Sequence, residues 1–303
     1  MHTSVLLNES IEYLNLNETK TVVDCTLGYA GHSSEILKRI KKGYLYAFDQ
    51  DKEAIKSSQE RLSKIGSNYK IIFSNFRYIK EKLNNEGINK VDAVLYDLGV
   101  SSPQLDNKER GFSFHQDAKL DMRMNQEQEL SAYHVVNNYS YEDLIRILRE
   151  YGEEKYASMI AKGIIKNRPI ETTLELTEIV KNSVPAAYRR EKHPARKTFQ
   201  AIRIEVNDEL NCFKDSLNDA LELLNVGGRI CVITFHSLED KICKEIFNNL
   251  SKVREEFKNL PIIPHEYEPK FKIVKVIEPS KEEIEINPRA RSAKLRVIER
   301  VWW

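Results

Sequence analysis

The sequence predicts an α/β fold in which a parallel sheet is wrapped by helices and interrupted by a helical insertion. Strand-like apolar runs alternate with amphipathic helical patterns up to about residue 104, and this alternation resumes after residue 208. The strand-like runs carry apolar residues on both faces, as a sheet covered by helices requires. With 303 residues, the chain can form one core plus a smaller domain. We therefore expect a sheet domain from residues 1–104 and 209–303, and an insertion over residues 105–208.

The individual elements follow from local patterns of apolar residues. In the first half, strands are predicted in "TVVDCTL", "YLYAFDQ", "YKIIFSNF" and "VDAVLYDLG", and helices over residues 33–40, 54–65 and 79–85. The second half predicts a helix in "CFKDSLNDALELLN", a turn at Gly227-Gly228, a strand in "RICVITFH" and a helix over 238–250. Two final strands, "FKIVKVIE" and "LRVIERV", are joined by a charged linker. The insertion contains only helical patterns, such as "YEDLIRILREYG".

Composition narrows the classes of function. The 47 basic and 46 acidic residues nearly cancel, so any surface for nucleic acid must be a local patch. The four cysteines lack C-x-x-C spacing, which argues against a zinc ribbon and a disulfide framework and favours a reducing compartment. No apolar run approaches the roughly 20 residues that a membrane helix needs. We expect a soluble cytoplasmic protein with no membrane span and no metal.

A small-residue loop between the first strand and the first helix indicates a site for a nucleotide-like cofactor. The loop "TLGYAGH" contains Gly28 and Gly31, which let a ligand approach the backbone at a helix N-terminus. Asp49 ends the second strand, close to the spacing of about 20 residues at which dinucleotide folds place an acid for ribose hydroxyls. The alternatives are an ordinary turn and a helix-capping role for Asp49, although Asp51 is better placed to cap.

Three further residues follow strand ends. Phe76 follows the third strand, where an adenine ring would need a flat apolar partner, although core packing explains it equally well. Asp97 ends the fourth strand and is followed by Gly99, two serines, a proline and Gln104. Such acceptors suit an exocyclic base amine that must be oriented for methyl transfer, and a solvated polar loop is the alternative. His236 ends a later strand, but a lone histidine is more often structural.

Basic and aromatic residues in two segments predict contacts with RNA. One segment supplies Arg189, Arg190, Lys192, Arg196 and Lys197, and the other supplies Arg289, Arg291, Lys294 and Arg296. Such clusters neutralise phosphates, although a charge run is often only a solvated face. Phe112, Phe114 and Phe199 stand among polar neighbours, where they can stack on an unpaired base or pack into the core.

Several blocks of the sequence carry a resemblance to a known family. They include "HTSVLLNE", "DCTLGYAGHS", "DLGVSSPQLDNKERGFSFHQDAKLDMRM", "YGEEKYASMIAKGI", "KHPARKTFQAIRIEVNDEL", "GGRICVITFHSLEDKICK" and "NPRARSAKLRVIER". Together they resemble the bacterial 16S ribosomal RNA (cytosine-N4)-methyltransferases, in order from His2 to Arg300. "DLGVSSPQLD", "RGFSF" and "NPRARS" are specific to that family rather than to methyltransferases at large.

The resemblance implies a seven-stranded, Rossmann-like class I methyltransferase sheet with an inserted helical domain for RNA recognition. It implies S-adenosylmethionine as cofactor and methylation of N4 of a cytosine in the decoding region of 16S ribosomal RNA, within the 30S subunit or a late assembly particle. Its implied cofactor contacts are Ala30, Gly31, His32, Asp49, Phe76, Asp97 and Gln104.

The same resemblance frames one hypothesis about catalysis and two departures from the family. We expect Asp97, or a carbonyl of the Ser101-Ser102-Pro103 turn, to accept a hydrogen bond from the N4 amine. Family members usually carry glycine at the positions of Cys25 and Ala30, and a methyl group at Ala30 restricts torsions that glycine allows. The cofactor turn is therefore where this sequence departs most from the family pattern.

Two other classes of function account for part of these observations. A nicotinamide-dependent dehydrogenase would share the glycine loop and Asp49, but it leaves the loop from Asp97 to Gln104 and the basic insertion unexplained. An RNA-binding module without catalytic activity would explain the basic clusters. It would leave the predicted cofactor crevice without a purpose.

Overall fold

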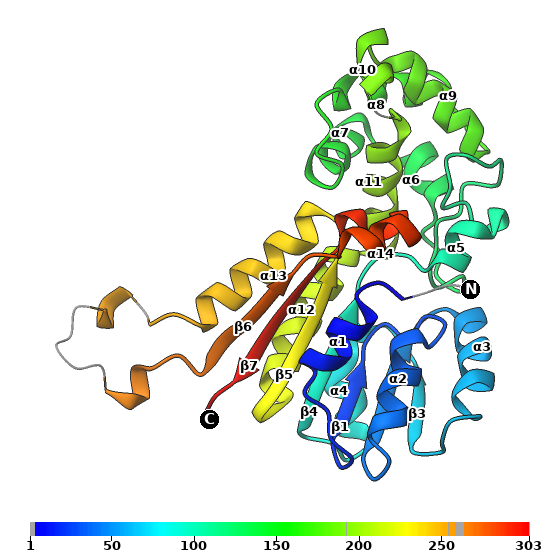
Figure 1. The fold of residues 1–303 in the computed structure, drawn as a ribbon. Coiled ribbons are helices and arrows are strands. Elements are labelled where there is room, and N and C mark those ends of the chain that lie inside the picture. Colours follow the sequence, from blue (N-terminus) through cyan, green and yellow to red (C-terminus); the bar gives the residue numbers. More distant parts are fainter. Residues whose placement is uncertain (1–3, 192, 254, 259–263, 303) are drawn as a thin grey trace. The chain divides into compact units, whose positions relative to one another are not determined.

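The computed structural model describes residues 4–191, 193–253, 255–258 and 264–302, with only the backbone described at residue 191. The chain packs as two compact units (Figure 1). Unit 1 comprises Met1–Gly99 and Leu210–Trp303, and unit 2 comprises Val100–Glu209. We describe each unit by itself.

Unit 1 contains a seven-stranded sheet with the order β3-β2-β1-β4-β5-β7-β6. Its strands are β1 (Thr21–Asp24), β2 (Tyr44–Asp49), β3 (Tyr69–Phe73), β4 (Val91–Asp97), β5 (Leu224–Thr234), β6 (Phe271–Ile277) and β7 (Lys294–Arg300). The first five strands run parallel, and β7 is antiparallel to both β5 and β6. This order with a reversed β7 is that of the class I methyltransferase sheet, so the predicted fold class is confirmed.

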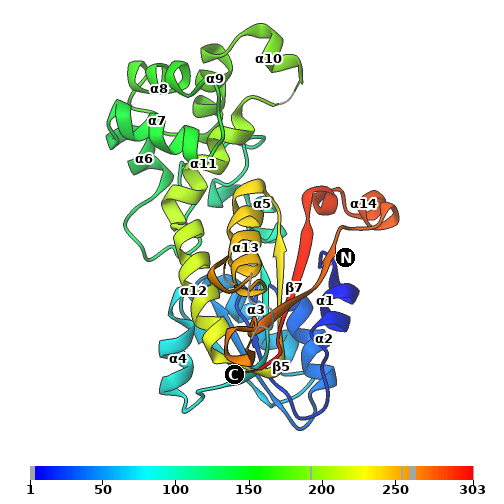
Figure 2. The same cartoon turned by 90° about the vertical axis from the view of Figure 1, so that its left-hand side faces the viewer.

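Helices cover both faces of the sheet because successive strand residues point to opposite sides. Val22 and Leu95 face a core that includes residues of α1 (Leu7–Tyr13), α2 (Gly31–Arg39) and α3 (Lys52–Leu62). Val23 and Val94 face the opposite core, formed with α4 (Ile79–Asn85), α12 (Glu209–Leu223) and α13 (Ser237–Leu250). Figure 2 shows α4, α12 and α13 on one side of the sheet and α1 and α2 on the other. The continuous apolar runs in the sequence reflect this double burial.

Two connections differ from the sequence-based predictions. Gly227 and Gly228 lie inside β5 rather than in a turn before it, since Val91 pairs with Leu224 and Ala93 with Arg229. The intervening residues of β5 bulge, and Gly227 has a φ of +77°. The linker between β6 and β7 contains α14 (Lys281–Ile286) and a 3-10 helix (Pro288–Ser292).

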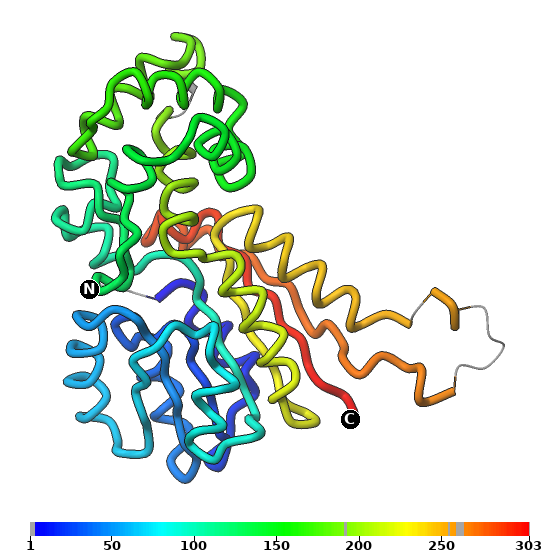
Figure 3. Tube along the Cα trace, turned by 180° about the vertical axis from the view of Figure 1, so that it is seen from behind, coloured from blue at the N-terminus to red at the C-terminus, as the bar shows by residue number. Residues whose placement is uncertain are grey.

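The connection between α13 and β6 contains two further 3-10 helices, Glu255–Phe257 and His265–Tyr267. These two 3-10 helices lie beyond the end of the sheet (Figure 3).

Unit 2 is helical and has its own hydrophobic core. It contains α5 (Ser102–Asp106), α6 (Ala132–Asn138), α7 (Tyr141–Glu150), α8 (Ala157–Lys166), α9 (Thr173–Ser183), α10 (Ala186–Glu191) and α11 (Ala195–Asn207), plus a 3-10 helix over Lys108–Arg110. Within its described part, extended pairing is limited to one bridge between Lys119 and Thr172. No helix among the residues described in either unit is long and apolar enough to cross a membrane.

Candidate active site

The candidate site lies at the carboxyl ends of β1, β2 and β4, where parallel α/β sheets bind ligands. Asp24, the last residue of β1, fixes the loop that follows. Its Oδ1 accepts a hydrogen bond from the Thr26 backbone at 3.0 Å, and its Oδ2 accepts one from Ser33 Oγ at 2.6 Å. Because Ser33 belongs to α2, these bonds tie the start of the loop to the first turn of the helix.

The turn into α2 has a left-handed residue and a close approach between two segments. Ala30 is buried and has a φ of +58°, a conformation that glycine adopts more readily. A Cβ on the next residue, Gly31, would lie only 1.8 Å from Ser4 Oγ. The other departure from the family, Cys25, lies in the core shared with Tyr96. Ala30 therefore adopts the conformation expected of the usual glycine, and Cys25 is accommodated by the core.

Asp49 is held at the end of β2 by backbone donors from Gly28, Gln50 and Asp51. Its Oδ2 accepts a hydrogen bond from Gly28 at 2.8 Å, and its Oδ1 accepts one from Asp51 at 2.8 Å. Asp51 caps α3 by accepting a bond from the Glu53 backbone, as the sequence predicted. Burial raises the pKa of Asp49 to about 7, against the opposing effect of the bonds from Asp51 and Gly28.

Asp97 and His32 form a pair with unused polar atoms. His32 Nδ1 lies 3.5 Å from Asp97 Oδ2. The buried atoms Asp97 Oδ1 and His32 Nε2 have no hydrogen-bond partner among the described residues. The Asp97 backbone donates to Thr26 Oγ1 at 2.7 Å, which joins β4 to the loop after β1. Such orphaned buried atoms are rare in folded proteins and point to a missing ligand.

Electrostatics distinguish the two members of this pair. Burial, reinforced by the charges of Asp24 and Glu239, raises the pKa of Asp97 to about 8. Burial lowers the pKa of His32 to about 4, against a hydrogen bond to the Val5 backbone that raises it. At neutral pH His32 is therefore uncharged, and it does not offset the cost of ionising Asp97.

Phe76 and Gln104 occupy different units. The Phe76 ring is half-buried in unit 1 and meets Tyr96 edge to face, with ring centroids 5.8 Å apart. Gln104 lies on α5 in unit 2 and is buried. Its Oε1 accepts a hydrogen bond from the Ser101 backbone at 3.0 Å, which closes a capping box at the start of α5. The contact described for Phe76 packs its 3-10 helix (Phe76–Tyr78) against β4, whereas the bond described for Gln104 stabilises the start of α5.

His236 and Glu239 form a capping box at the start of α13. Buried Glu239 accepts hydrogen bonds from the backbones of Phe235 and His236, at 2.8 and 3.3 Å. His236 Nε2 lies 3.1 Å from Glu239 Oε1. His236 also has a buried ring nitrogen, Nδ1, that makes no hydrogen bond to any described residue, as His32 does.

The predicted RNA-binding cations differ in how far they are already engaged. Lys197 Nζ donates to the Glu153 carbonyl at 2.6 Å, and Arg189 Nε donates to the Val184 carbonyl at 3.3 Å. Arg190 and Arg196 are exposed and form no ion pair with any residue that the structure describes. Lys192 lies outside the described residues.

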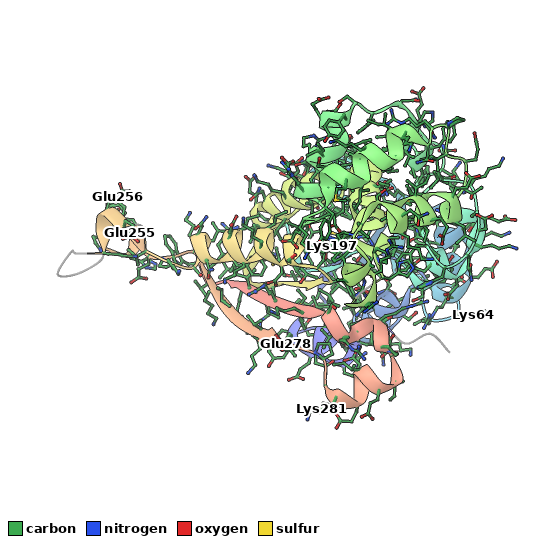
Figure 4. All side chains as sticks on the ribbon, turned by 90° about the horizontal axis from the view of Figure 1, so that it is seen from above. Lys64, Lys197, Glu255, Glu256, Glu278 and Lys281 are labelled. Atoms are coloured by element: carbon green, nitrogen blue, oxygen red, sulfur yellow. The ribbon has the colours of Figure 1, made fainter. Side chains whose placement is uncertain are left out.

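In the second basic segment, Arg289 and Arg291 are exposed on the 3-10 helix before β7. Arg296 makes two bonds to Asp240, at 2.7 and 3.0 Å. Lys294 Nζ lies 3.4 Å from Glu278, which is labelled in Figure 4 beside the start of α14. The cations nearest the end of the chain therefore have protein partners.

Two of the three predicted stacking residues are buried. Phe112 is 6% exposed and Phe199 is 4% exposed, and both belong to the core of unit 2. Phe114 is half-buried at the edge of that core. Only Phe114 of the three keeps substantial ring surface for a base.

The sequence analysis missed two acids that shape the site. Asp24 follows "TVV" at the end of β1, and Glu239 lies on α13, yet the charges of both raise the pKa of Asp97. Asp24 could have been found, because it ends a buried strand as Asp49 and Asp97 do. Glu239 gave no such signal, since an acid in the first turn of a helix is ordinary capping chemistry.

The hydrogen-bond acceptors of the site fit a cofactor that carries both hydroxyl groups and positive charge. Asp49 and Asp97 offer carboxylate oxygens, and His32 offers an unused ring nitrogen. No group of three or more His, Cys, Asp or Glu side chains within the described ranges can hold a metal ion. S-adenosylmethionine carries a ribose, an ammonium and a sulfonium group, and these match the acceptors available.

Comparisons with known proteins agree with this chemistry. A model of the MraW methylase family matches residues 1–301. A curated protein of Exiguobacterium sibiricum, "Ribosomal RNA small subunit methyltransferase H", is 53% identical over 306 residues, which cover 99% of this chain and 98% of that protein.

Similarities to solved structures are weaker. An rRNA methylase from Streptococcus thermophilus aligns with a TM-score of 0.47 and 12% identity over 99% of each chain. A Streptococcus mutans protein solved in complex with SAH aligns with a TM-score of 0.45 and 13% identity, also over 99% of each chain. The assignment rests on the sequence matches, which span nearly the whole chain and confirm the predicted resemblance. The chain belongs to the MraW methylase family.

Proposed function

We propose that this methylase transfers the methyl group of S-adenosylmethionine to N4 of a cytosine in the decoding region of 16S ribosomal RNA. The relative named for small-subunit ribosomal RNA methylation, at 53% identity, supports the substrate class. The observation that carries the proposal is the His32–Asp97 pair, whose unused buried atoms lie at the end of β4. The 30S subunit or a late assembly particle in the cytoplasm is the proposed substrate.

The proposed cofactor contacts lie mainly in unit 1. Asp49 receives the ribose hydroxyls, the turn of Ala30, Gly31 and His32 borders the methionine portion, and Phe76 borders the adenine. Gln104 is the remaining proposed contact. S-adenosylmethionine supplies a methyl group already activated by the sulfonium, so alignment and proton removal are the main tasks left to the protein.

Asp97 has the proposed catalytic role. The lone pair of a cytosine amine is delocalised into the ring, and an acceptor on an N4 hydrogen turns that lone pair toward the methyl carbon. Asp97 Oδ1 is such an acceptor, and it would take the proton that N4 loses as the new C–N bond forms and the S–CH3 bond breaks with its electron pair left on sulfur. A carbonyl of the Ser101-Ser102-Pro103 turn is the alternative acceptor.

The two domains predicted from the sequence have different proposed roles. Residues 1–104 and 209–303 form the methyltransferase core, and residues 105–208 recognise RNA. Arg189, Arg190, Lys192, Arg196 and Lys197, with Arg289 and Arg291 outside the insertion, are the proposed phosphate contacts.

The test is transfer of labelled methyl groups from S-adenosylmethionine to 30S subunits purified from cells that lack this activity, followed by nucleoside mass spectrometry. N4-methylcytidine is the expected product. Naked 16S RNA and late assembly particles, assayed in parallel, distinguish the forms of the substrate. Cofactor binding without label transfer to any of the three would refute the substrate assignment.

A further inference from the structure

Three aromatic rings lie against one another at the surface of unit 2, and we call Phe114, His115 and His193 the ring cluster. Phe114 stacks on His193 with centroids 4.5 Å apart and an interplanar angle of 25°. His115 lies 4.3 Å from Phe114 and 5.3 Å from His193. Below the cluster, buried Phe199 meets Phe114 edge to face at 5.6 Å. The rings are thus held in fixed positions by a side chain of the helical core.

Part of the ring surface of the cluster is accessible to solvent. Packing into the core alone would cover that surface. His115 is exposed, and Phe114 and His193 are half-buried. Buried Phe112 and Phe199 already anchor this segment to the core. Loop anchoring therefore accounts for the inner phenylalanines and leaves the outer rings unexplained.

His193 adds a polar atom without a protein partner. Its Nδ1 is buried and makes no hydrogen bond to any described residue. Burial, with the nearby charges of His115 and Lys181, lowers the pKa of His193, which keeps its ring neutral at pH 7. A neutral imidazole can stack on a base and hydrogen-bond to its edge.

Positive charge adjoins the cluster. The Arg196 backbone donates to the His193 carbonyl at 3.2 Å, and its exposed guanidinium has no ion pair within the described part of the chain. The first turn of α11 contains Arg196 and Lys197 but no acidic residue. Cations there oppose the helix dipole, so this placement costs helix stability unless an anion is nearby.

We propose that the ring cluster stacks against an unpaired base of the RNA substrate, with Arg196 neutralising an adjacent phosphate. This inference rests on the proposed function and assigns it a base-binding surface within the insertion. Stacking of a base on an aromatic ring tolerates any base, because every base has a π face. The cluster therefore adds affinity for single-stranded RNA without selecting its sequence.

The test uses the full chain and a short single-stranded RNA that carries one 2-aminopurine. Stacking on the cluster should quench the probe as wild-type protein is added. Phe114→Ala and His115→Ala should each weaken RNA binding about tenfold, within the range of a lost base stack, and should abolish the quench. Phe114→Trp, which keeps an aromatic ring, should keep both the RNA affinity and the quench of the probe. S-adenosylmethionine affinity should not change, because none of the three rings is among the proposed cofactor contacts.

Phe73→Ala is the matched control, since Phe73 is 46% exposed but lies on β3 in unit 1. Because His115 is exposed, His115→Ala should leave the fold intact, and it therefore keeps the test decisive if Phe114→Ala misfolds. The proposal is overturned if wild-type protein leaves the probe unquenched, or if His115→Ala and Phe114→Ala bind like wild type. If the variants lose RNA binding while wild type makes no N4-methylcytidine in 30S subunits, the ring cluster stands and the proposed function fails.

Discussion

Asp97 is the residue at which cofactor binding and proton binding are coupled. Its pKa of about 8 means that the carboxyl group is mostly protonated at pH 6.5 in the free protein. A bound cation favours the carboxylate and lowers this pKa. Binding of S-adenosylmethionine at pH 6.5 should therefore release close to one proton, and affinity should rise about tenfold per pH unit until it levels off above pH 8.

Calorimetry in buffers of different ionisation enthalpy measures this proton release directly. Asp97→Asn should remove the share of the release that comes from Asp97 and make the pH dependence of affinity shallower, while Asp49, whose pKa is about 7, still contributes as its carboxylate accepts the ribose hydroxyls. S-adenosylhomocysteine, which lacks the sulfonium charge, should release less. An observed heat of binding that is the same in all buffers would contradict the assignment of Asp97 to the cofactor.

Ala30 is the residue at which this chain departs most informatively from its family. Its φ of +58° and complete burial leave no room for a branched side chain. Ala30→Val should cost about 2–4 kcal/mol, from left-handed strain and overpacking together. Ala30→Gly should stay within about 1 kcal/mol of wild type, because relief of strain is offset by a more flexible unfolded chain and a lost methyl contact.

Urea denaturation of the two Ala30 variants compares these costs. Equal stability of the valine and glycine variants would mean that the turn can leave the left-handed conformation. The sequence could flag this position only through the resemblance, because composition alone does not distinguish an alanine in a helix from one in a strained turn.

At the scale of elements, α13 depends on one buried acid. Glu239→Ala would leave the backbone N–H groups of Phe235 and His236 without their acceptor, which should cost about 2–4 kcal/mol. Glu239→Gln keeps an oxygen acceptor and should cost less than about 1.5 kcal/mol. Because the charge of Glu239 raises the pKa of Asp97, the glutamine variant should also lower that pKa.

Chemical denaturation measures the first effect of the Glu239 substitutions, and proton release on cofactor binding measures the second. Glu53→Ala on α3 is a suitable control, since Glu53 also lies in the first turn of a helix but is exposed. Identical stability of the alanine and glutamine variants would show that the two backbone groups do not depend on Glu239.

The sequence predicts those elements whose position depends on the burial of apolar residues. It predicts less well the irregular backbone and the contacts between side chains far apart in the sequence. The helix over Ile79–Asn85 was predicted to the residue, because its apolar spacing meets one core. The pair Gly227-Gly228 predicts a turn but forms a bulge in β5, since glycine pairs are typical of both. The pairing of His32 with Asp97 joins a helix start to a strand end far away in sequence, and no local pattern encodes that contact.

At the scale of the whole molecule, the nearly neutral net charge makes RNA affinity depend on a few local cations. The structure separates cations with protein partners from those without. Arg296 is bonded to Asp240, whereas exposed Arg190 and Arg196 form no ion pair with the residues described. Only cations available to phosphates release counterions from the RNA when it binds.

Substitution of Arg190 and Arg196 by glutamine should therefore reduce the slope of log affinity against log salt concentration by about 1.4–1.8, at roughly 0.7–0.9 per phosphate contact. The measurement is binding of 30S subunits or their RNA at several salt concentrations. Lys64→Gln is the matched control, because Lys64 is exposed in unit 1 (Figure 4) and should leave the slope unchanged. Arg296→Gln should also leave it unchanged, since that guanidinium is already bonded to Asp240. A slope that falls equally for all these variants would mean that RNA responds to total charge rather than to a local surface on the insertion.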